Sequence, residues 1–430
     1  MIDKVKIFIL VMFISCRITA QQENAVLSEN ADTSLINTSH LDHLYEKVKI
    51  EGREAGIIHI YAEAPDYKWT DAPGEGAACV DDIARAAIFY LRYHAAVDDS
   101  MSLEKARSLL DCLFLMQADN GLFYNFINPD MTINKTGSNS QPKADWWTWR
   151  ALWAMGEAYR YFSDKDKKLA SELKESIVRG YSSLNSMIKN YPKTTTVKGI
   201  KLPTWLPYQY ASDQASVIIM GLIPFYEAVK DTAYLRYIRI LSKGIMMMQS
   251  GDSLKFPYGA HLSWENTWHA WGASQPEALL RAGGLLKDNE MIKSALKEVN
   301  HFYNYLVKEK YLNEFSLSGG KAEKVSKYPQ IAYGINPMVS ASIEAYRLTS
   351  DTKYAERGAD FAGWFRGMNA AGKPMYDPKT GRCYDGLVSD EKINLNSGAE
   401  STIEALLALL EVEQNPVSRK ELQDLMHGRE

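Results

Sequence analysis

Residues 79–93 read CVDDIARAAIFYLRY, a helical pattern that is apolar on nearly every side and rich in alanine. A helix of this kind is buried all round, whereas a surface helix keeps one charged face. The pattern recurs five more times, after loops that contain Gly, Asp, Asn or Trp. The recurrences are residues 145–162, 213–229, 273–286, 336–348 and 397–412. Successive starts lie between 60 and 68 residues apart, which indicates a structural repeat.

More conventional amphipathic helices alternate with these buried ones. We predict them at residues 102–116, 169–188, 233–248, 288–307, 352–368 and 415–427. Small side chains let the buried helices approach one another closely, while the amphipathic helices cover them from outside. The alternation predicts an all-α fold, an (α/α)6 toroid of six helical hairpins, with residues 38–430 forming a single domain.

The long connections between hairpins carry a second repeated feature. Several outer helices are followed by a glycine, at positions 121, 251 and 367, which we expect to adopt the left-handed conformation. Short aromatic segments then follow, which we predict to be extended. They are residues 122–124, 256–258 and 375–376. Connections of this length are typical of binding loops.

The N-terminus has the pattern of a secretory signal. Two lysines precede an apolar run from Ile7 to Ile14, which is too short to span a bilayer. Cleavage after Ala20 would release a soluble protein, whereas the alternative interpretation, an imperfect lipoprotein box, makes Cys16 a lipidated anchor. We predict a signal peptide over residues 1–20, a flexible leader over 21–37, and a periplasmic or outer-membrane-associated protein.

Bulk composition excludes several other classes of protein. The net charge is −4 and no Lys/Arg-rich block is present, which argues against a nucleic-acid partner. No segment has 18 consecutive apolar residues, so we expect no transmembrane helix. Cys79, Cys112 and Cys383 are far apart and odd in number, which indicates buried thiols rather than a disulfide framework. We expect a monomer without a cofactor.

The inner helices of such a toroid all begin at the same end, so residues at their starts should converge. The acids there are Asp81, Asp82, Asp145, Asp213, Glu265, Asp385 and Glu400. The other polar and aromatic residues there are Trp146, Trp147, Arg150, Trp264, Trp268, His269 and Asn396. An acid in the first turn of a helix is often only a cap or a dipole partner, and this structural interpretation stays open for each. Arg85 and Arg150 should each orient an acid, because a buried guanidinium group needs a carboxylate.

Carboxylates and indoles gathered at one rim suit a carbohydrate ligand. Aromatic faces stack on pyranose rings, carboxylates bind hydroxyl groups, and two acids flanking a glycosidic bond can act as general acid and as base or nucleophile. The histidines have no metal-binding spacing, since only His261 and His269 lie close together near these positions. We therefore predict no metal site.

Two segments near the C-terminus, CYDGL (383–387) and NLNSGAEST (394–402), resemble a bacterial family of the six-hairpin glycosidase class. Members of that family often carry the toroid fused to, or encoded beside, glycosyltransferase modules or mannoside-processing enzymes. Other segments are similar to its motifs, namely VDDIARA (80–86), RALWAMG (150–156) and WGASQPEALL (271–280). The resemblance extends from about residue 75 to residue 412, and it implies the toroid fold and a carbohydrate substrate.

The chain departs from the family pattern in its second and third repeats. Trp149 stands where the pattern has a glycine before Arg150, and Asp145 lies farther from that arginine than the family's acid. The third repeat, which begins at Asp213, has no counterpart in the pattern. The resemblance therefore supports the fold and the substrate class rather than a mechanism.

The leading hypothesis is an exported glycoside hydrolase that cleaves a glycan or oligosaccharide and inverts the configuration of the anomeric carbon. Asp82 and Glu400 are the expected acid and base pair. The alternates are Asp145, Asp213, Glu265 and Asp385, and the residues expected to line the subsites are Trp146, Trp147, Trp264 and Trp268. Two alternatives stay open. A polysaccharide lyase would use a base and a cation, for which His269, Tyr210 and Arg150 are candidates. A non-catalytic glycan-binding protein would need no carboxylate pair.

Overall fold

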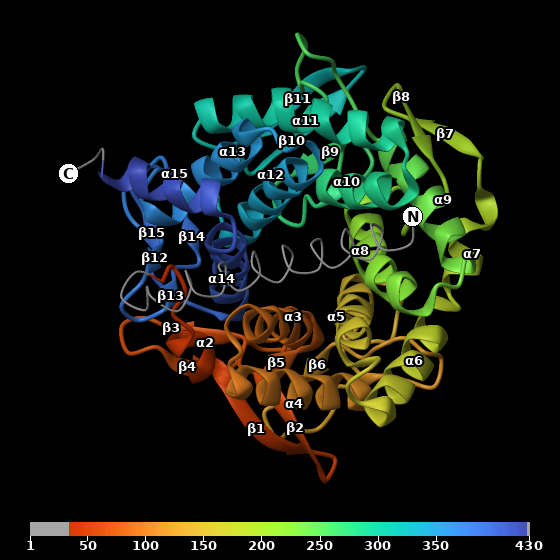
Figure 1. Ribbon diagram of the computed structural model, residues 1–430, viewed down its shortest axis with the longest axis vertical. Helices are drawn as coiled ribbons and strands as arrows, with labels where there is room; N and C mark the ends of the chain where they lie inside the picture. Colours follow the sequence, from red (N-terminus) through yellow and green to blue (C-terminus); the bar gives the residue numbers. More distant parts are fainter. Residues whose placement is uncertain (1–33, 428–430) are drawn as a thin grey trace, which may run out of the picture.

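The computed structural model describes residues 34–427, which form a closed ring of helical hairpins (Figure 1). The inner helices are α3 (Val80–Val97), α5 (Trp146–Phe162), α8 (Ser212–Val229), α10 (Gln275–Leu286), α12 (Asn336–Thr349) and α14 (Ala399–Glu413). Each inner helix contacts the next, and α14 contacts α3, so the ring closes. Every inner helix begins within two residues of its predicted start. The predicted toroid is confirmed.

An outer helix covers each inner helix. The outer helices are α4 (Ser100–Met116), α6 (Lys167–Tyr181), α9 (Ala233–Met247), α11 (Asn289–Lys308), α13 (Thr352–Ala362) and α15 (Pro416–His427). Two of them end earlier than predicted. Tyr181 is followed by the short helices α7 (Leu184–Met187) and η2 (Ile188–Asn190), and Ala362 by η4 (Gly363–Arg366). Tighter turns of this kind are common where an α-helix ends.

Small residues bring the inner helices into close contact. Every residue of α8 from Ser212 to Phe225 is buried, as expected for a helix that is apolar on nearly every side. A Cβ atom added to Gly156 on α5 would lie 2.5 Å from the carbonyl oxygen of Gly221 on α8. The glycines therefore allow the two backbones to approach more closely than any larger residue would.

The connections form small antiparallel sheets. The pairs are β1 (Tyr45–Ile50) with β2 (Arg53–Ile58), β3 (Tyr61–Glu63) with β4 (Lys68–Thr70), β5 (Ala78–Cys79) with β6 (Phe126–Ile127), β7 (Thr194–Val197) with β8 (Ile200–Pro203), β12 (Tyr376–Asp377) with β13 (Arg382–Cys383), and β14 (Gly386–Leu387) with β15 (Ile393–Asn394). Strand β10 (Glu314–Ser318) lies between β9 (Thr267–His269) and β11 (Lys321–Ser326). Short helices α2 (Ser39–Leu44) and η3 (Ala332–Gly334) complete the chain.

The predicted glycine turns are confirmed, but one of the predicted extended segments is wrong. Gly121, Gly251 and Gly367 have φ angles of 82°, 73° and 95°. Tyr376 lies in β12, whereas residues 256–258 form a turn that is closed by a hydrogen bond of 2.9 Å from the Tyr258 N–H to the Lys255 carbonyl oxygen. That tight turn leaves no extended backbone at this position.

The described chain begins at Ser34, inside the predicted leader. The signal peptide, Cys16 and most of the leader lie outside the described residues. Within the predicted leader, Leu35 and Ile36 are buried, and the Leu35 N–H donates to Glu413 at 3.0 Å, so these two residues pack against the toroid. Between residues 34 and 427, no helix is both long enough and apolar enough to cross a membrane.

The predicted buried thiols are confirmed. Cys79, Cys112 and Cys383 are free and buried. Burial raises the pKa of the Cys79 thiol well above its ordinary value, so this thiol is protonated and can act as a hydrogen-bond donor.

Candidate active site

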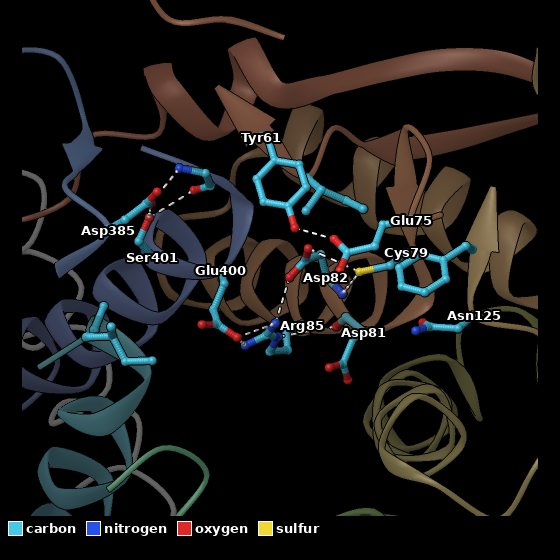
Figure 2. Close-up of a pocket in the computed structure, with 15 residues that line it drawn as sticks. Tyr61, Glu75, Cys79, Asp81, Asp82, Arg85, Asn125, Asp385, Glu400 and Ser401 are labelled. Carbon is cyan, nitrogen blue, oxygen red and sulfur yellow. Dashed lines mark hydrogen bonds and ion pairs between the residues drawn. The ribbon is translucent and has the colours of Figure 1, made fainter. Parts of the chain in front are cut away.

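A pocket of about 420 Å³ lies at the rim, the end of the toroid at which the inner helices begin (Figure 2). It adjoins the first turns of α3 and α14, the two helices at which the ring closes. We call it the Glu400 pocket. Its lining residues are Ile60, Tyr61, Glu75, Cys79, Asp81, Asp82, Arg85, Asn125, Phe126, Ile331, Ala332, Asp385, Gly398, Glu400 and Ser401. Its volume is within the usual range for sites that bind small molecules.

Arg85 joins the acids of α3 to those of α14. Its guanidinium group donates to Asp82 at 2.6 Å and to Glu404 at 2.9 Å. Both nitrogens of its fork also contact Glu400, at 3.3 Å. The side chains of Arg85, Asp82 and Glu404 are each 3% exposed, so the cluster is shielded from solvent. The expectation that Arg85 is paired with an acid is confirmed.

Asp82 uses both of its carboxylate oxygens within the protein. Oδ1 accepts from Arg85, and Oδ2 accepts the Cys79 thiol at 3.2 Å. Burial raises the pKa of Asp82, and the Arg85 guanidinium group opposes that rise. With 2% of the residue exposed, Asp82 is better placed to hold Arg85 than to contact a substrate.

Glu400 differs from Asp82 in being open to the pocket. Its side chain is 43% exposed, although it lies in the first turn of the buried helix α14. The pKa of Glu400 is raised to about 7, chiefly because its surroundings shield it from bulk water, with Asp82 and Glu404 adding to the effect and Arg85 opposing it. Close to neutral pH this carboxyl group therefore exists partly as a proton donor.

Asp81 also lines the pocket and pairs with Arg150 of the second inner helix, α5. Its Oδ1 lies 2.7 Å from the Nε atom of Arg150, whose side chain is 3% exposed. The guanidinium groups of Arg150 and Arg85 lie over the same ring, that of Tyr333, at 4.7 and 5.0 Å from its centroid. The expectation that Arg150 is paired with an acid is confirmed.

Asp385 lines the pocket but also stabilises the start of α14. Its Oδ1 accepts the Gly398 N–H at 2.9 Å and the Ser401 hydroxyl at 2.7 Å. Both donors belong to the first turn of the helix, so Asp385 serves as a cap supplied from the preceding connection. Burial raises the pKa of Asp385, and these two hydrogen bonds oppose the rise.

Tyr61, Glu75 and Asn125 are polar lining residues that were not singled out from the sequence. Tyr61, on β3, donates its hydroxyl to Glu75, which lies between two glycines of positive φ in the connection to β5. Asn125 precedes β6 and presents its carboxamide to the pocket (Figure 2). The two glycines around Glu75, and the place of Asn125 in a long connection, were the only sequence signals for these positions.

Asp145 lies at the start of α5 but does not line the Glu400 pocket. Its Oδ1 accepts the Trp146 N–H at 2.8 Å and the Gln214 amide at 3.1 Å, and its Oδ2 accepts the Tyr208 hydroxyl at 2.6 Å. Tyr208 is 54% exposed and has a φ of 47°. Asp145 therefore caps its helix and fixes an exposed tyrosine on the neighbouring connection.

Asp213 and His269 form a buried pair near the next two inner helices. The Asp213 Oδ2 lies 3.0 Å from the His269 Nε2, and the His269 Nδ1 contacts the Trp271 carbonyl oxygen at 2.7 Å. Trp271 stacks on the imidazole ring at 3.6 Å between centroids. Burial raises the pKa of Asp213, and His269 opposes the rise. Both imidazole nitrogens thus already have protein partners.

The connection before α10, which contains β9, places Trp268 differently from the prediction. Trp268 is fully buried, stacked on Phe315 at 5.4 Å, so the expectation that it lines a subsite is wrong. Strand pairing causes this, because Phe315 on β10 is the register partner of Trp268 on β9. Trp264 is 45% exposed. It lies with Glu265 in the turn before β9, outside the Glu400 pocket.

The remaining predicted contacts also lie outside the Glu400 pocket. Trp147 is buried and donates its indole N–H to the Phe123 carbonyl oxygen at 2.6 Å. Trp146 contacts Trp271 at 5.7 Å between centroids. The Asn396 Oδ1 accepts the Ala64 N–H at 3.1 Å, which ties the N-terminal strands to the connection before α14.

The structure therefore brings together only part of the predicted site. The predicted residues that line the Glu400 pocket are Asp81, Asp82, Asp385 and Glu400. No tryptophan of the described residues lines it, so the indoles expected at the rim do not surround this pocket. Over the same residues, 34–427, no three His, Cys, Asp or Glu side chains are grouped so as to hold a metal ion.

Comparison with known proteins places the chain by its fold. Protein-family models give no match to the chain, and neither do curated protein sequences. A solved structure of cellobiose 2-epimerase from Bacillus thermoamylovorans B4167 is similar, with a TM-score of 0.62 and 10% identity over 91% of this chain and 99% of that one.

Two further solved structures share the fold. A sugar epimerase from a ruminal bacterium gives a TM-score of 0.59 with 14% identity, over 88% of this chain and 95% of that one. A D-mannose isomerase gives a TM-score of 0.53 with 13% identity, over 81% of this chain and 93% of that one. At such low identity these likenesses show a shared helical toroid and leave the activity to be argued from the site.

Proposed function

We propose that the protein is a carbohydrate-processing enzyme, a glycoside hydrolase in which Glu400 is the general acid. The observation that carries this proposal is a carboxyl group with a pKa of about 7, open to a pocket lined by further carboxylates. A general acid works best when its pKa lies near the working pH, because it must hold a proton and still release it readily. Glu400 would protonate the glycosidic oxygen as the bond to the leaving sugar breaks.

The second carboxylate of the pair is Glu75. Asp82, the predicted partner of Glu400, has both oxygens engaged by Arg85 and Cys79. Glu75 is held by the Tyr61 hydroxyl through one oxygen, and Figure 2 shows Glu75 and Glu400 on either side of Asp82. Glu75 would take a proton from a water molecule that attacks the anomeric carbon. Attack from the face opposite the leaving group gives an inverted product, as we predict.

Arg85 and Asp82 act as positioning residues in this scheme. Arg85 contacts Glu400 at 3.3 Å and lowers its pKa, which burial alone would raise further. Asp82 and Glu404 fix the guanidinium group from the other side, so the position of Glu400 depends on a buried ion-pair cluster. The acid is thus pre-organised before a substrate binds.

An epimerase or isomerase is the alternative suggested by the names of the structural neighbours. Such chemistry moves a proton on carbon and needs a base that faces the sugar. His269 is the candidate base, but its two nitrogens contact Asp213 and Trp271, and it does not line the Glu400 pocket. A lyase would need His269 or Tyr210 as its base and a free cation, whereas neither base lines the Glu400 pocket and Arg150 is paired with Asp81. The site geometry therefore favours hydrolysis.

One experiment separates these activities. The wild-type protein and Glu400→Gln are incubated with a panel of oligosaccharides, and the products are separated and weighed by mass spectrometry. Hydrolysis gives shorter sugars that together have gained one water, whereas epimerisation leaves the mass unchanged and a lyase gives a product that absorbs in the ultraviolet. Shorter sugars from the wild type but not from Glu400→Gln would support the proposal. Unchanged masses would refute it.

We also propose that the protein works outside the cytoplasm. The support is the signal-like segment of residues 1–20. Mass spectrometry of the protein from its native cells distinguishes a mature chain that begins at Gln21 from one that begins at a lipidated Cys16. An unprocessed N-terminus in the cytoplasmic fraction would contradict export.

A further inference from the structure

The carboxamide of Asn125 is a buried polar group aimed into the Glu400 pocket. The residue is 7% exposed, and within the described part of the chain its Oδ1 has no hydrogen-bond partner. Leaving a buried acceptor unsatisfied costs about 1–3 kcal/mol, so such groups are uncommon in folded proteins unless a ligand or water completes them. Asn125 is therefore a candidate contact for a ligand.

The backbone around Asn125 is firmly held. Its carbonyl oxygen accepts the Val80 N–H at 2.8 Å, at the start of α3, and its N–H donates to the Ser140 carbonyl oxygen at 3.1 Å. The neighbouring Phe126 pairs with Cys79 between β6 and β5. Two well-formed backbone contacts thus hold residue 125 beside the start of α3, where Asp81 and Asp82 lie.

The charges of the pocket define which ligand fits beside Asn125. The carboxylates that line it are Glu75, Asp81, Asp82, Asp385 and Glu400. Arg85 is its single lining cation among the described residues, and Arg85 is already paired with Asp82 and Glu404. An anionic sugar would face several negative charges without a free positive partner, which costs binding energy.

We propose that the Glu400 pocket binds a neutral glycosyl residue, that its carboxylates disfavour an anionic one, and that Asn125 binds hydroxyl groups of the bound sugar. The carboxamide offers one acceptor and two donors, which match a hydroxyl group that both donates and accepts. The surrounding carboxylates accept hydrogen bonds from further hydroxyls. This proposal rests on the proposed function in one respect, that the sugar binds in the Glu400 pocket. It concerns binding of the sugar and not cleavage of a bond.

Binding is measured with the full chain carrying Glu400→Gln, so that no turnover disturbs the titration. The ligands are pairs of methyl hexosides and the matching methyl hexuronides, which differ only at the sixth carbon atom. Isothermal titration calorimetry gives the affinity of each. The neutral member of at least one pair is expected to bind about tenfold or more tightly than its hexuronide.

Asn125 is tested in the same background by Asn125→Leu, which removes hydrogen bonding, and by Asn125→Asp, which keeps the shape. Asn128→Asp is the matched control, because Asn128 lies on the same connection, makes a solvent-exposed hydrogen bond to Thr132 and does not line the pocket. Both Asn125 variants should weaken the neutral glycoside about tenfold, and the control should stay within twofold. Circular dichroism confirms folding, and if the leucine variant is unfolded the aspartate variant decides.

Three results would overturn the inference: no binding by any hexoside, hexuronides binding as tightly as hexosides, or Asn125 variants within twofold of the parent. The proposed function fails separately. Tight, Asn125-dependent binding of a neutral sugar that the wild type never cleaves would refute the hydrolase and leave this inference standing. Cleavage by the wild type, together with unchanged sugar affinity in the Asn125 variants, would support the hydrolase and refute this inference.

Discussion

The raised pKa of Glu400 sets the pH at which the enzyme should lose activity. Glu400 must carry a proton to act as the general acid, and its pKa is about 7. The protonated fraction then falls about tenfold for each pH unit above that value, so kcat/KM should fall about tenfold between pH 8 and pH 9. An unshifted glutamate, with its pKa of 4.5, would lose its proton far below neutral pH.

Glu404→Gln provides the perturbation that tests the cause of the shift. Glu404 raises the pKa of Glu400 by its charge, after burial and Asp82 in importance, and it also occupies Arg85 at 2.9 Å. Removing its charge takes away a repulsion and frees the guanidinium group to stabilise the Glu400 carboxylate. Both effects lower the pKa of Glu400, so the alkaline fall in kcat/KM should begin at a lower pH.

The assay is kcat/KM from pH 5 to pH 9 at constant ionic strength, with a substrate found in the oligosaccharide panel. Glu400→Gln should lose about 100-fold or more in activity. Glu227→Gln is the control, since Glu227 pairs with Arg160 in a separate pocket and should leave the profile unchanged. The reasoning would be refuted if kcat/KM fell at the same alkaline pH in Glu404→Gln as in the wild type. It would also be refuted if the wild-type fall began below pH 5.5.

Three further predictions concern stability and product. Gly156→Ala should lower the free energy of unfolding by about 1–3 kcal/mol in urea titrations, because its Cβ meets the Gly221 carbonyl oxygen at 2.5 Å; equal stability would contradict such close helices. Arg85→Met should cost about 3–5 kcal/mol in the same assay, because buried carboxylates lose their cation; a cost below 1 kcal/mol would contradict it. Nuclear magnetic resonance of the first product formed should show the inverted anomer, and a retained one would exclude the water-activating role of Glu75.

Stability should also depend on the charge of Glu400. Its folded pKa of about 7 lies above the unfolded value of 4.5, so its contribution to stability is complete below pH 4.5 and is lost as the pH rises through 7. Glu400→Gln should therefore be more stable than the wild type at pH 8, by about 1 kcal/mol after allowing for the exposure of the side chain. Thermal unfolding at pH 4 and pH 8 measures the difference, which should vanish at pH 4.

The sequence predicted the ring because its inner helices have a composition that only burial explains. Segments such as residues 213–229 are apolar on nearly every side, and they recur at nearly constant spacing. That spacing located the helix starts, and with them Asp81, Asp82 and Glu400 at the rim. The partners of Arg85 and Arg150 followed from the requirement that a buried cation has a carboxylate beside it.

The shape of the site could not be predicted from the same pattern. Which residues share a cavity depends on how long connections fold over the rim, and that packing joins positions far apart in the chain. Tyr61, on β3, and Glu75, in the connection to β5, reach the pocket from the chain that precedes the first hairpin. Trp268 leaves the rim because β9 pairs with β10 and turns the indole into the core. Neither of these arrangements can be predicted from the local composition.

The central claim, that Glu400 protonates a glycosidic bond while Glu75 activates water, is tested most directly by cleavage in water labelled with oxygen-18. We predict that wild-type protein splits a neutral oligosaccharide and places one labelled oxygen at the newly formed anomeric carbon, and that Glu400→Gln and Glu75→Gln each release little product. A product without label, an isomer of unchanged mass, or full activity in either variant would contradict the account.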